Sequence, residues 1–208
     1  MTPEAVDAVI LAGGRARRLG GVDKGLLPLR GRPLVAWVAQ RLAPQVDSIC
    51  ISANRHVDDY AALGYPVVPD TLPDHPGPLA GILAATAAPG REWVLTTPCD
   101  TPFLPADLVR SLLAAARQAG VPLARAASPE QTHYAVMLVQ RALLPDLADF
   151  VASGGRQVQA WQARHAHVDV RFEAGEAAFF NVNTPDDLAR AEAMVAALAS
   201  AGTGTRIG

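Results

Sequence analysis

The segment VILAGGRARRLGGVDKGLLPL, residues 9–29, decides the fold class of this chain. It begins as a buried strand that ends at Gly13 and Gly14, and it continues as a loop rich in glycine and positive charge. The basic residues of this loop are Arg15, Arg17, Arg18 and Lys24. Glycines let backbone amides approach an anion closely, and the basic side chains can add charge-assisted hydrogen bonds. The loop therefore predicts a phosphate site, although a solvated turn explains Arg15 and Arg17 equally well.

The glycine spacing matches neither of two well-known phosphate-binding loops. A P-loop requires Gly-Lys followed by Ser or Thr, whereas Lys24 lies between Asp23 and Gly25. A dinucleotide-binding loop requires GxGxxG, whereas Gly13 and Gly14 are adjacent. The loop therefore indicates a different class of nucleotide site.

Short apolar runs alternate with helical patterns along the rest of the chain. The predicted strands are residues 5–11, 46–52, 65–70, 92–100, 121–125, 133–139 and 166–172. The predicted helices are residues 33–44, 57–63, 77–88 and 105–120, and a last helix with Thr184 as N-cap and Pro185 as its first residue. This alternation predicts one α/β domain over residues 1–200 with a mainly parallel sheet covered on both faces, and a flexible tail over 201–208. Ligands of such sheets bind beyond the carboxyl ends of the strands, where Gly13, Asp70 and Asp100 lie.

Composition excludes several classes of protein. Of the 208 residues, 50% are apolar and 18% are charged, and the formal net charge of -2 gives no reason to expect nucleic acid or an acidic membrane as a partner. Cys50 and Cys99 have no metal-ligand spacing, and no segment reads as a signal sequence or membrane span. We therefore expect a cytoplasmic protein, and a monomer.

Four motifs in order resemble a known family. They are RRLGGVDKGLL (Arg17–Leu27), PGPLAG (Pro76–Gly81), PCDTP (Pro98–Pro102) and FFNVNTPDDL (Phe179–Leu188). Together they are similar to the nucleotidyltransferases of sugar nucleotides and cofactors, and within them to the molybdenum cofactor guanylyltransferases, over residues 8–190. The resemblance implies a three-layer, Rossmann-like nucleotidyltransferase fold.

The resemblance also implies roles for particular residues. Catalysis would fall to Arg18, Lys24 and Asp100. Nucleotide binding would fall to Leu11, Ala12, Gly13, Gly14, Lys24, Ser52, Asp70, Asp100, Asn181 and Asn183. Asp100 would hold Mg²⁺, which commonly takes one or two carboxylates together with substrate phosphate oxygens. Without the resemblance, Asp70 and Asp100 read equally well as turn residues, and Asn181 and Asn183 as turn and cap residues.

The implied reaction is GMP transfer from GTP to the terminal phosphate of molybdopterin, with release of pyrophosphate. The implied partners are GTP, molybdopterin, cofactor-assembly proteins and the molybdoenzyme apoproteins. Two departures bear on specificity: Ser52 stands where relatives carry asparagine, and Tyr134 follows His133 where relatives often carry proline. The alternatives are a cytidylyltransferase or a sugar-1-phosphate nucleotidyltransferase, and a nucleotide or cofactor carrier without catalytic activity.

Overall fold

A seven-stranded sheet forms the centre of the molecule in the computed structural model, which describes residues 5–12, 23–70, 77–173 and 175–202. The strands are β1 (Val6–Leu11), β4 (Ser48–Ser52), β5 (Val67–Val68), β6 (Trp93–Pro98), β7 (Leu123–Ala127), β8 (Thr132–Gln140) and β9 (Val168–Arg171). Their order across the sheet is β5-β4-β1-β6-β8-β7-β9. All strands run parallel except β8, which is antiparallel to both β6 and β7. The expected α/β fold with a mainly parallel sheet is confirmed.

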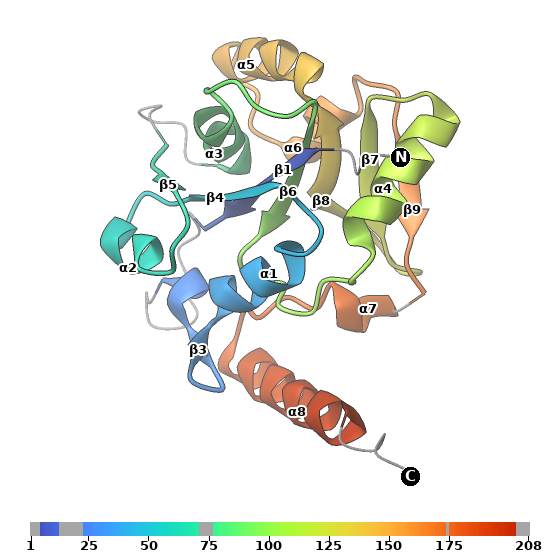
Figure 1. The fold of residues 1–208 in the computed structure, drawn as a ribbon. Helices are drawn as coiled ribbons and strands as arrows, with labels where there is room; N and C mark the ends of the chain where they lie inside the picture. Colours follow the sequence, from blue (N-terminus) through green and yellow to red (C-terminus); the bar gives the residue numbers. More distant parts are fainter. Residues whose placement is uncertain (1–4, 13–22, 71–76, 174, 203–208) are drawn as a thin grey trace.

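Helices cover both faces of this sheet (Figure 1). One face carries α1 (Leu34–Leu42) and α4 (Leu108–Ala119), and the opposite face carries α3 (Pro78–Ala85), α5 (Leu144–Ala152) and α6 (Val158–Gln162). Alternation along β1 explains the division. Val6, Ala8 and Ile10 enter the core beneath α1 and α4, whereas Val9 enters the core beneath α3 and α5. A strand buried on both faces in this way reads as a continuous apolar run.

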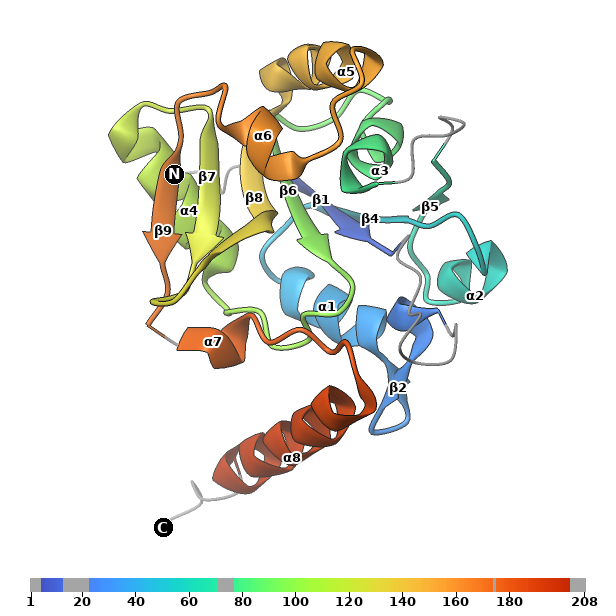
Figure 2. The same cartoon turned by 180° about the vertical axis from the view of Figure 1, so that it is seen from behind.

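The last helix, α8 (Pro185–Gly202), lies outside this sandwich, beyond α1 (Figure 2). It packs against a small hairpin of β2 (Pro28–Leu29) and β3 (Arg32–Pro33). The hairpin turn has positive φ at Arg30 (52°) and Gly31 (76°), as a tight two-residue connection requires. The packing of α8 against this hairpin holds together two distant parts of the sequence: the residues that follow the charged loop and the residues near the carboxyl terminus.

Some elements differ from the sequence prediction. The helix expected from residue 105 begins at Leu108, because Pro105 to Asp107 form a turn ahead of it; it ends as expected at Gly120, which has φ 63°. The hairpin, α5, α6 and α7 (Gly175–Ala178) were not predicted. Thr184 caps α8 as predicted, since its Oγ1 accepts a hydrogen bond from the Asp187 amide. Within the described ranges, no helix combines the length and the apolar character that a membrane span needs.

The order of the strands locates the ligand crevice. From β1 the chain first moves to β4 and β5 on one side, and it later returns to place β6 on the other side of β1. Ligands of open α/β sheets bind at such a switch point, outside the carboxyl ends of the strands. The relevant ends here belong to β1, β4, β5 and β6.

Candidate active site

Predicted site residues lie in one row along the carboxyl edge of the sheet. Leu11, the last residue of β1, pairs with Ser52 on one side and with Pro98 on the other. Two residues beyond Pro98 the chain reaches Asp100, and beyond β5 it reaches Asp70. The structure therefore places these strand ends together, as the sequence predicted.

Lys24 brings three predicted residues into contact. It begins the short 3₁₀ helix η2 (Lys24–Leu26), and its Nζ lies 2.8 Å from Asp100 Oδ2. The same ammonium group donates a hydrogen bond to Asn183 Oδ1. The side chains of Lys24 and Asp100 are 19% and 11% exposed, so this ion pair is only weakly screened by water. Lys24 is also the only lysine in the 208-residue sequence. The other 17 of its 18 lysine and arginine residues are arginines.

Asp100 has one carboxylate oxygen to spare. Its Oδ2 binds Lys24, while its Oδ1 is buried and has no hydrogen-bond partner among the described residues. Buried polar atoms are nearly always satisfied, so an unpaired carboxylate oxygen at a strand end calls for a ligand. The oxygens of Asp100 and Asn183 both face the Lys24 ammonium. Such hard oxygen donors suit Mg²⁺, which prefers oxygen ligands.

Cys99, which precedes Asp100, is a core residue and not a nucleophile. It is 4% exposed and belongs to the core beneath α1. Burial, together with the negative charges of Asp100 and Asp23, raises the pKa of the Cys99 thiol far above its usual range. A thiol that stays protonated is a poor nucleophile.

The segment that carries Asn181 and Asn183 is tied to the site at several points. The Val182 amide donates to the Asp100 carbonyl oxygen at 3.0 Å. The Asp187 carboxylate accepts hydrogen bonds from the Asn183 amide at 3.0 Å and from the Thr184 amide at 2.9 Å. Asn183 thus reaches Lys24 from a fixed backbone. Asn181 and Asn183 are both exposed, and of the two it is Asn183 that contacts Lys24.

Ahead of this segment, Phe179 stacks on His133, with ring centroids 4.4 Å apart. His133 belongs to the His133-Tyr134 pair at which the sequence departs from its relatives. Burial lowers the pKa of His133, and its Nε2 is buried without a hydrogen-bond partner in the described part of the chain. A neutral imidazole therefore packs beside the segment that leads to the site.

The ends of β4 and β5 hold the side chains predicted to contact the base. Ser52 is 5% exposed, and its Oγ lies only 2.5 Å from where a Cβ on Gly81 would stand, so α3 packs closely against it. Asn54 Oδ1 accepts a hydrogen bond from the Asp70 amide at 2.5 Å. This bond joins the two strand ends and fixes the backbone that carries Asp70.

Part of the predicted site lies outside the described residues. Gly13, Gly14 and Arg18 belong to this part, as do Arg15 and Arg17. The neighbouring Ala12 is described, and its amide donates to the Ser52 carbonyl oxygen at 2.8 Å. The Ala12 amide is therefore engaged within the sheet.

A buried group beside Lys24 was missed by the sequence analysis. The Asp23 carboxylate accepts a hydrogen bond from the Tyr60 hydroxyl and lies 3.6 Å from Arg55 Nη2. The available signal was the acidic residue directly before the lone lysine.

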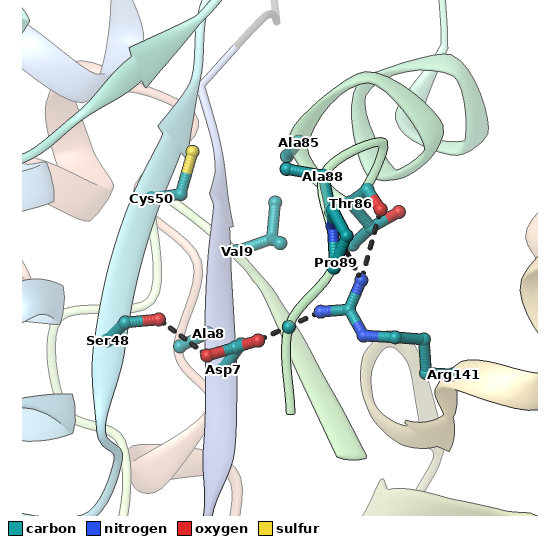
Figure 3. A pocket seen from close by; sticks show the side chains of 11 residues that line it. Asp7, Ala8, Val9, Ser48, Cys50, Ala85, Thr86, Ala88, Pro89 and Arg141 are labelled. Carbon is teal, nitrogen blue, oxygen red and sulfur yellow. Dashed lines mark hydrogen bonds and ion pairs between the residues drawn. The ribbon is translucent and has the colours of Figure 1, made fainter. Parts of the chain in front are cut away.

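A pocket of about 190 Å³ lies at the opposite, amino edge of the sheet, between β1, β4 and the loop after α3 (Figure 3). The Arg141 side chain extends into this pocket from the end of β8. Its guanidinium donates hydrogen bonds to Asp7 and to the carbonyl oxygens of Thr86, Ala88 and Arg91. Because its polar groups satisfy one another, this pocket is a structural junction and not the candidate active site.

Comparisons with known proteins show the family of this chain. The family model of the MobA-like NTP transferase domain matches residues 8–169. A protein of Burkholderia orbicola named molybdenum cofactor guanylyltransferase is 48% identical over 197 residues, which cover 89% of this chain and 94% of the relative. A protein of the same name from Cupriavidus necator is 42% identical over 188 residues, covering 88% of this chain and 94% of the relative.

A solved structure has the same fold. The crystal structure of molybdopterin-guanine dinucleotide biosynthesis protein A from Archaeoglobus fulgidus superposes with a TM-score of 0.75. It covers 92% of this chain and 99% of its own, at 23% sequence identity. By its sequence, this chain belongs to the MobA-like NTP transferase family.

Proposed function

We propose that this protein transfers GMP from GTP to the terminal phosphate of molybdopterin and releases pyrophosphate. An oxygen of the acceptor phosphate attacks the α-phosphorus of GTP, and the bond from that phosphorus to the oxygen bridging to the β-phosphate breaks. The observation that carries the proposal is the contact of Lys24 with Asp100 and Asn183 at the carboxyl edge of the sheet. The names of the relatives, molybdenum cofactor guanylyltransferase, support the identity of the transferred group and of the acceptor.

Lys24 supplies positive charge to the triphosphate. Two anions must approach each other in this reaction, so their repulsion must be offset by fixed cations. The Lys24 ammonium is held in a mostly buried place by two oxygens, and its direction is therefore set before GTP arrives. Arg18 and the amides of Gly13 and Gly14, in the loop that follows β1, would complete the cradle.

Asp100 and Asn183 would hold Mg²⁺. The unpaired Asp100 Oδ1 is the protein ligand best suited to the ion, and the oxygen of Asn183 lies on the same ammonium group. An ion held there would supply positive charge to offset the negative charge that develops on the phosphate oxygens.

Base recognition falls to the ends of β4 and β5. The Asp70 carboxylate can accept hydrogen bonds from guanine N1–H and the 2-amino group. Asn54 fixes the Asp70 backbone, and Ser52 lines the neighbouring strand end. Serine offers a shorter side chain than asparagine at position 52, so Asp70 carries more of the discrimination in this chain.

The reaction needs no general base. The acceptor is a phosphate monoester with a second pKa of about 6, so it is already an anionic nucleophile near neutral pH. This agrees with the protonated state of Cys99 and with the packed position of His133.

A transfer assay tests the proposal. Protein, molybdopterin and Mg²⁺ are incubated with GTP or with CTP, and pyrophosphate release is measured together with the dinucleotide product. We expect release with GTP, little with CTP, and loss of release when a chelator removes Mg²⁺. Asp100→Ala and Lys24→Ala should each lower kcat by about 10²-fold or more, as expected for groups that stabilise transferring charge. Arg110→Ala, which changes an exposed arginine on α4, is the matched control and should turn over normally.

Two outcomes would overturn the proposal. Faster transfer from CTP would assign the protein to cytidylyl transfer. Tight GTP binding without pyrophosphate release would indicate a carrier.

A further inference from the structure

We propose that Asp23 is a positioning residue, which Tyr60 and Arg55 hold in place so that Lys24 faces Asp100. The proposal rests on the role of Lys24 in the proposed function and adds the group that directs it. Asp23 would not contact the substrate itself, because its carboxylate is buried. Its effect on transfer would pass through the backbone of residues 23–25.

The Asp23 carboxylate is buried and held from three directions. Asp23 is 4% exposed, and its Oδ1 accepts hydrogen bonds from the Tyr60 hydroxyl and from the Gly25 amide, the latter at 3.3 Å. Its Oδ2 lies 3.6 Å from Arg55 Nη2, which is buried and has no hydrogen-bond partner within the described ranges. Tyr60 comes from α2 (Val57–Ala61), and Arg55 from the segment between β4 and α2. The Asp23 carboxylate is thus held both by the backbone that follows it, at Gly25, and by the segment of residues 55–60.

Gly25 shows how closely this part of the chain is seated. A Cβ at Gly25 would lie 2.3 Å from the Tyr60 hydroxyl oxygen, a distance that only glycine permits. Tyr60 itself is fully buried in the core beneath α1. Asp23 and Gly25 therefore both contact the buried Tyr60 side chain, while Lys24 between them extends toward Asp100 and Asn183.

Stability alone is a poor reason for this arrangement. The Asp23 carboxylate loses its hydration on burial, and the Arg55 side chain that faces it is 38% exposed and 3.6 Å away, so this ion pair contributes little net stability. A buried polar group is better explained where it fixes one geometry. Burial, with the nearby Cys99 and Asp23, also raises the pKa of Tyr60 far above its usual range, so its hydroxyl remains a donor throughout the working pH range.

The lone lysine allows a direct test without substrate. Protein grown with [¹³Cε]lysine should give one methylene resonance, from Lys24, because the sequence has no other lysine. Tyr60→Phe removes a single hydroxyl and keeps the ring, and Asp23→Asn keeps the size of the side chain. We expect both variants to shift this resonance and to raise the rate at which the Lys24 amine reacts with an acylating reagent. Asp7→Asn is the matched control, because Asp7 also binds an arginine and a backbone amide but lies at the opposite edge.

A double-mutant cycle tests the same inference on turnover. Tyr60→Phe and Asp23→Asn should each lower kcat by roughly 10- to 100-fold with little change in KM for GTP, since small displacements of a catalytic group cost this much. In a Lys24→Ala background, either change should lower the remaining kcat by less than about twofold, because residues that act as a unit are not additive. Asp7→Asn should lower the melting temperature and leave kcat unchanged.

The inference would be overturned if the lysine resonance and acylation rate of both variants matched the wild type. It would also be overturned if their losses in kcat multiplied fully with that of Lys24→Ala. A wild-type protein that releases no pyrophosphate would instead overturn the proposed function, and the resonance and labelling experiments would still decide whether Asp23 directs Lys24.

Discussion

Replacing Arg141 with alanine tests how much stability depends on the amino edge of the sheet. The guanidinium donates to the Arg91 carbonyl oxygen at 2.7 Å, to those of Thr86 and Ala88 at 3.0 and 3.2 Å, and to Asp7 Oδ2 at 2.8 Å. These bonds join the end of β8 to β1 and to the loop before β6 (Figure 3). Arg141→Ala therefore removes one connection between three segments.

The size of the effect follows from the contacts. A hydrogen bond to a neutral acceptor contributes about 1 kcal/mol and one to a charged group about 1.5–3 kcal/mol. Water can reach the three carbonyl oxygens after the change, and Asp7 keeps its bonds from the Ser48 hydroxyl and the Arg91 amide. The side chains of Arg141 and Asp7 are 21% and 19% exposed, which favours the lower part of the range. Counting about 1.5 kcal/mol for the bond to Asp7 and about 0.5 kcal/mol for each of the three carbonyl bonds that water can replace, we expect a loss of about 3 kcal/mol in the free energy of unfolding.

Thermal and urea unfolding followed by circular dichroism measure this loss. For a chain of this size, 3 kcal/mol corresponds to a fall of about 6–12 °C in Tm. Arg110→Ala is the control, because Arg110 is exposed on α4 and only 3.8 Å from Asp107, and its Tm should change by no more than about 2 °C. If the Tm of Arg141→Ala falls by less than about 3 °C, the hydrogen bonds of Arg141 do not contribute the stability assigned to them.

Acid should narrow the difference between wild type and Arg141→Ala. Burial acts to raise the pKa of Asp7, but hydrogen bonds from Ser48 and the Arg91 amide, and the charge of Arg141, lower it below its usual range. A carboxyl group with a lowered pKa stabilises the fold above its unfolded pKa of about 3.9 and loses this contribution as the pH falls through the folded value. The difference in the free energy of unfolding should therefore shrink below about pH 4, while the part that comes from the carbonyl hydrogen bonds of Arg141 remains. A difference that stays constant with pH would contradict the assigned ion pair.

Three further predictions concern the carboxyl edge. Gly81→Ala should displace the Ser52 hydroxyl and raise the Kd for GTP several-fold, as Ser52→Ala should; equal affinity to wild type would count against a role for this strand end. Asp187→Ala removes the hydrogen bonds that the carboxylate accepts from the Asn183 and Thr184 amides at the start of α8, and calorimetry should show a loss of about 1 kcal/mol in the free energy of unfolding. Because burial lowers the pKa of His133, protonation opposes folding below about pH 6.5; the urea midpoint should fall with acid, and less so in His133→Asn.

The positions of the site residues along the strands could be predicted from the sequence. Asp70 and Asp100 follow apolar runs, and parallel strands bring such ends to one edge. The contact between Lys24 and Asp100, 76 residues apart, was predictable only as proximity, because the sequence does not state how η2 turns. The resemblance to a family named both residues, and the structure adds that their side chains lie 2.8 Å apart.

Other features were beyond periodicity. The reversal at β8 follows from the length of the connection and not from periodicity. The four residues between Ala127 and Thr132 close a hairpin and are too few for the crossover of about a dozen residues that a parallel pair needs. The helix α5 did leave a signal, since Leu144, Leu147 and Val151 recur at helical spacing. The partners of Asp23 left none, because a buried carboxylate is recognised only once Tyr60 and Arg55 are placed around it.

The polarity of β1 matters for engineering this protein. Asp7 anchors the amino edge, and Leu11 opens on the candidate active site, four residues or about 13 Å further along the strand. Substitutions separated by more than 7–10 Å without shared partners usually have additive effects on stability. A library that changes base or acceptor preference near Ser52 and Asp70 will include many variants too unstable to survive. Stabilising changes around Asp7 could rescue such variants without altering their selectivity. Stabilising substitutions at the amino end of β1 are therefore best introduced before the carboxyl end is varied for selectivity.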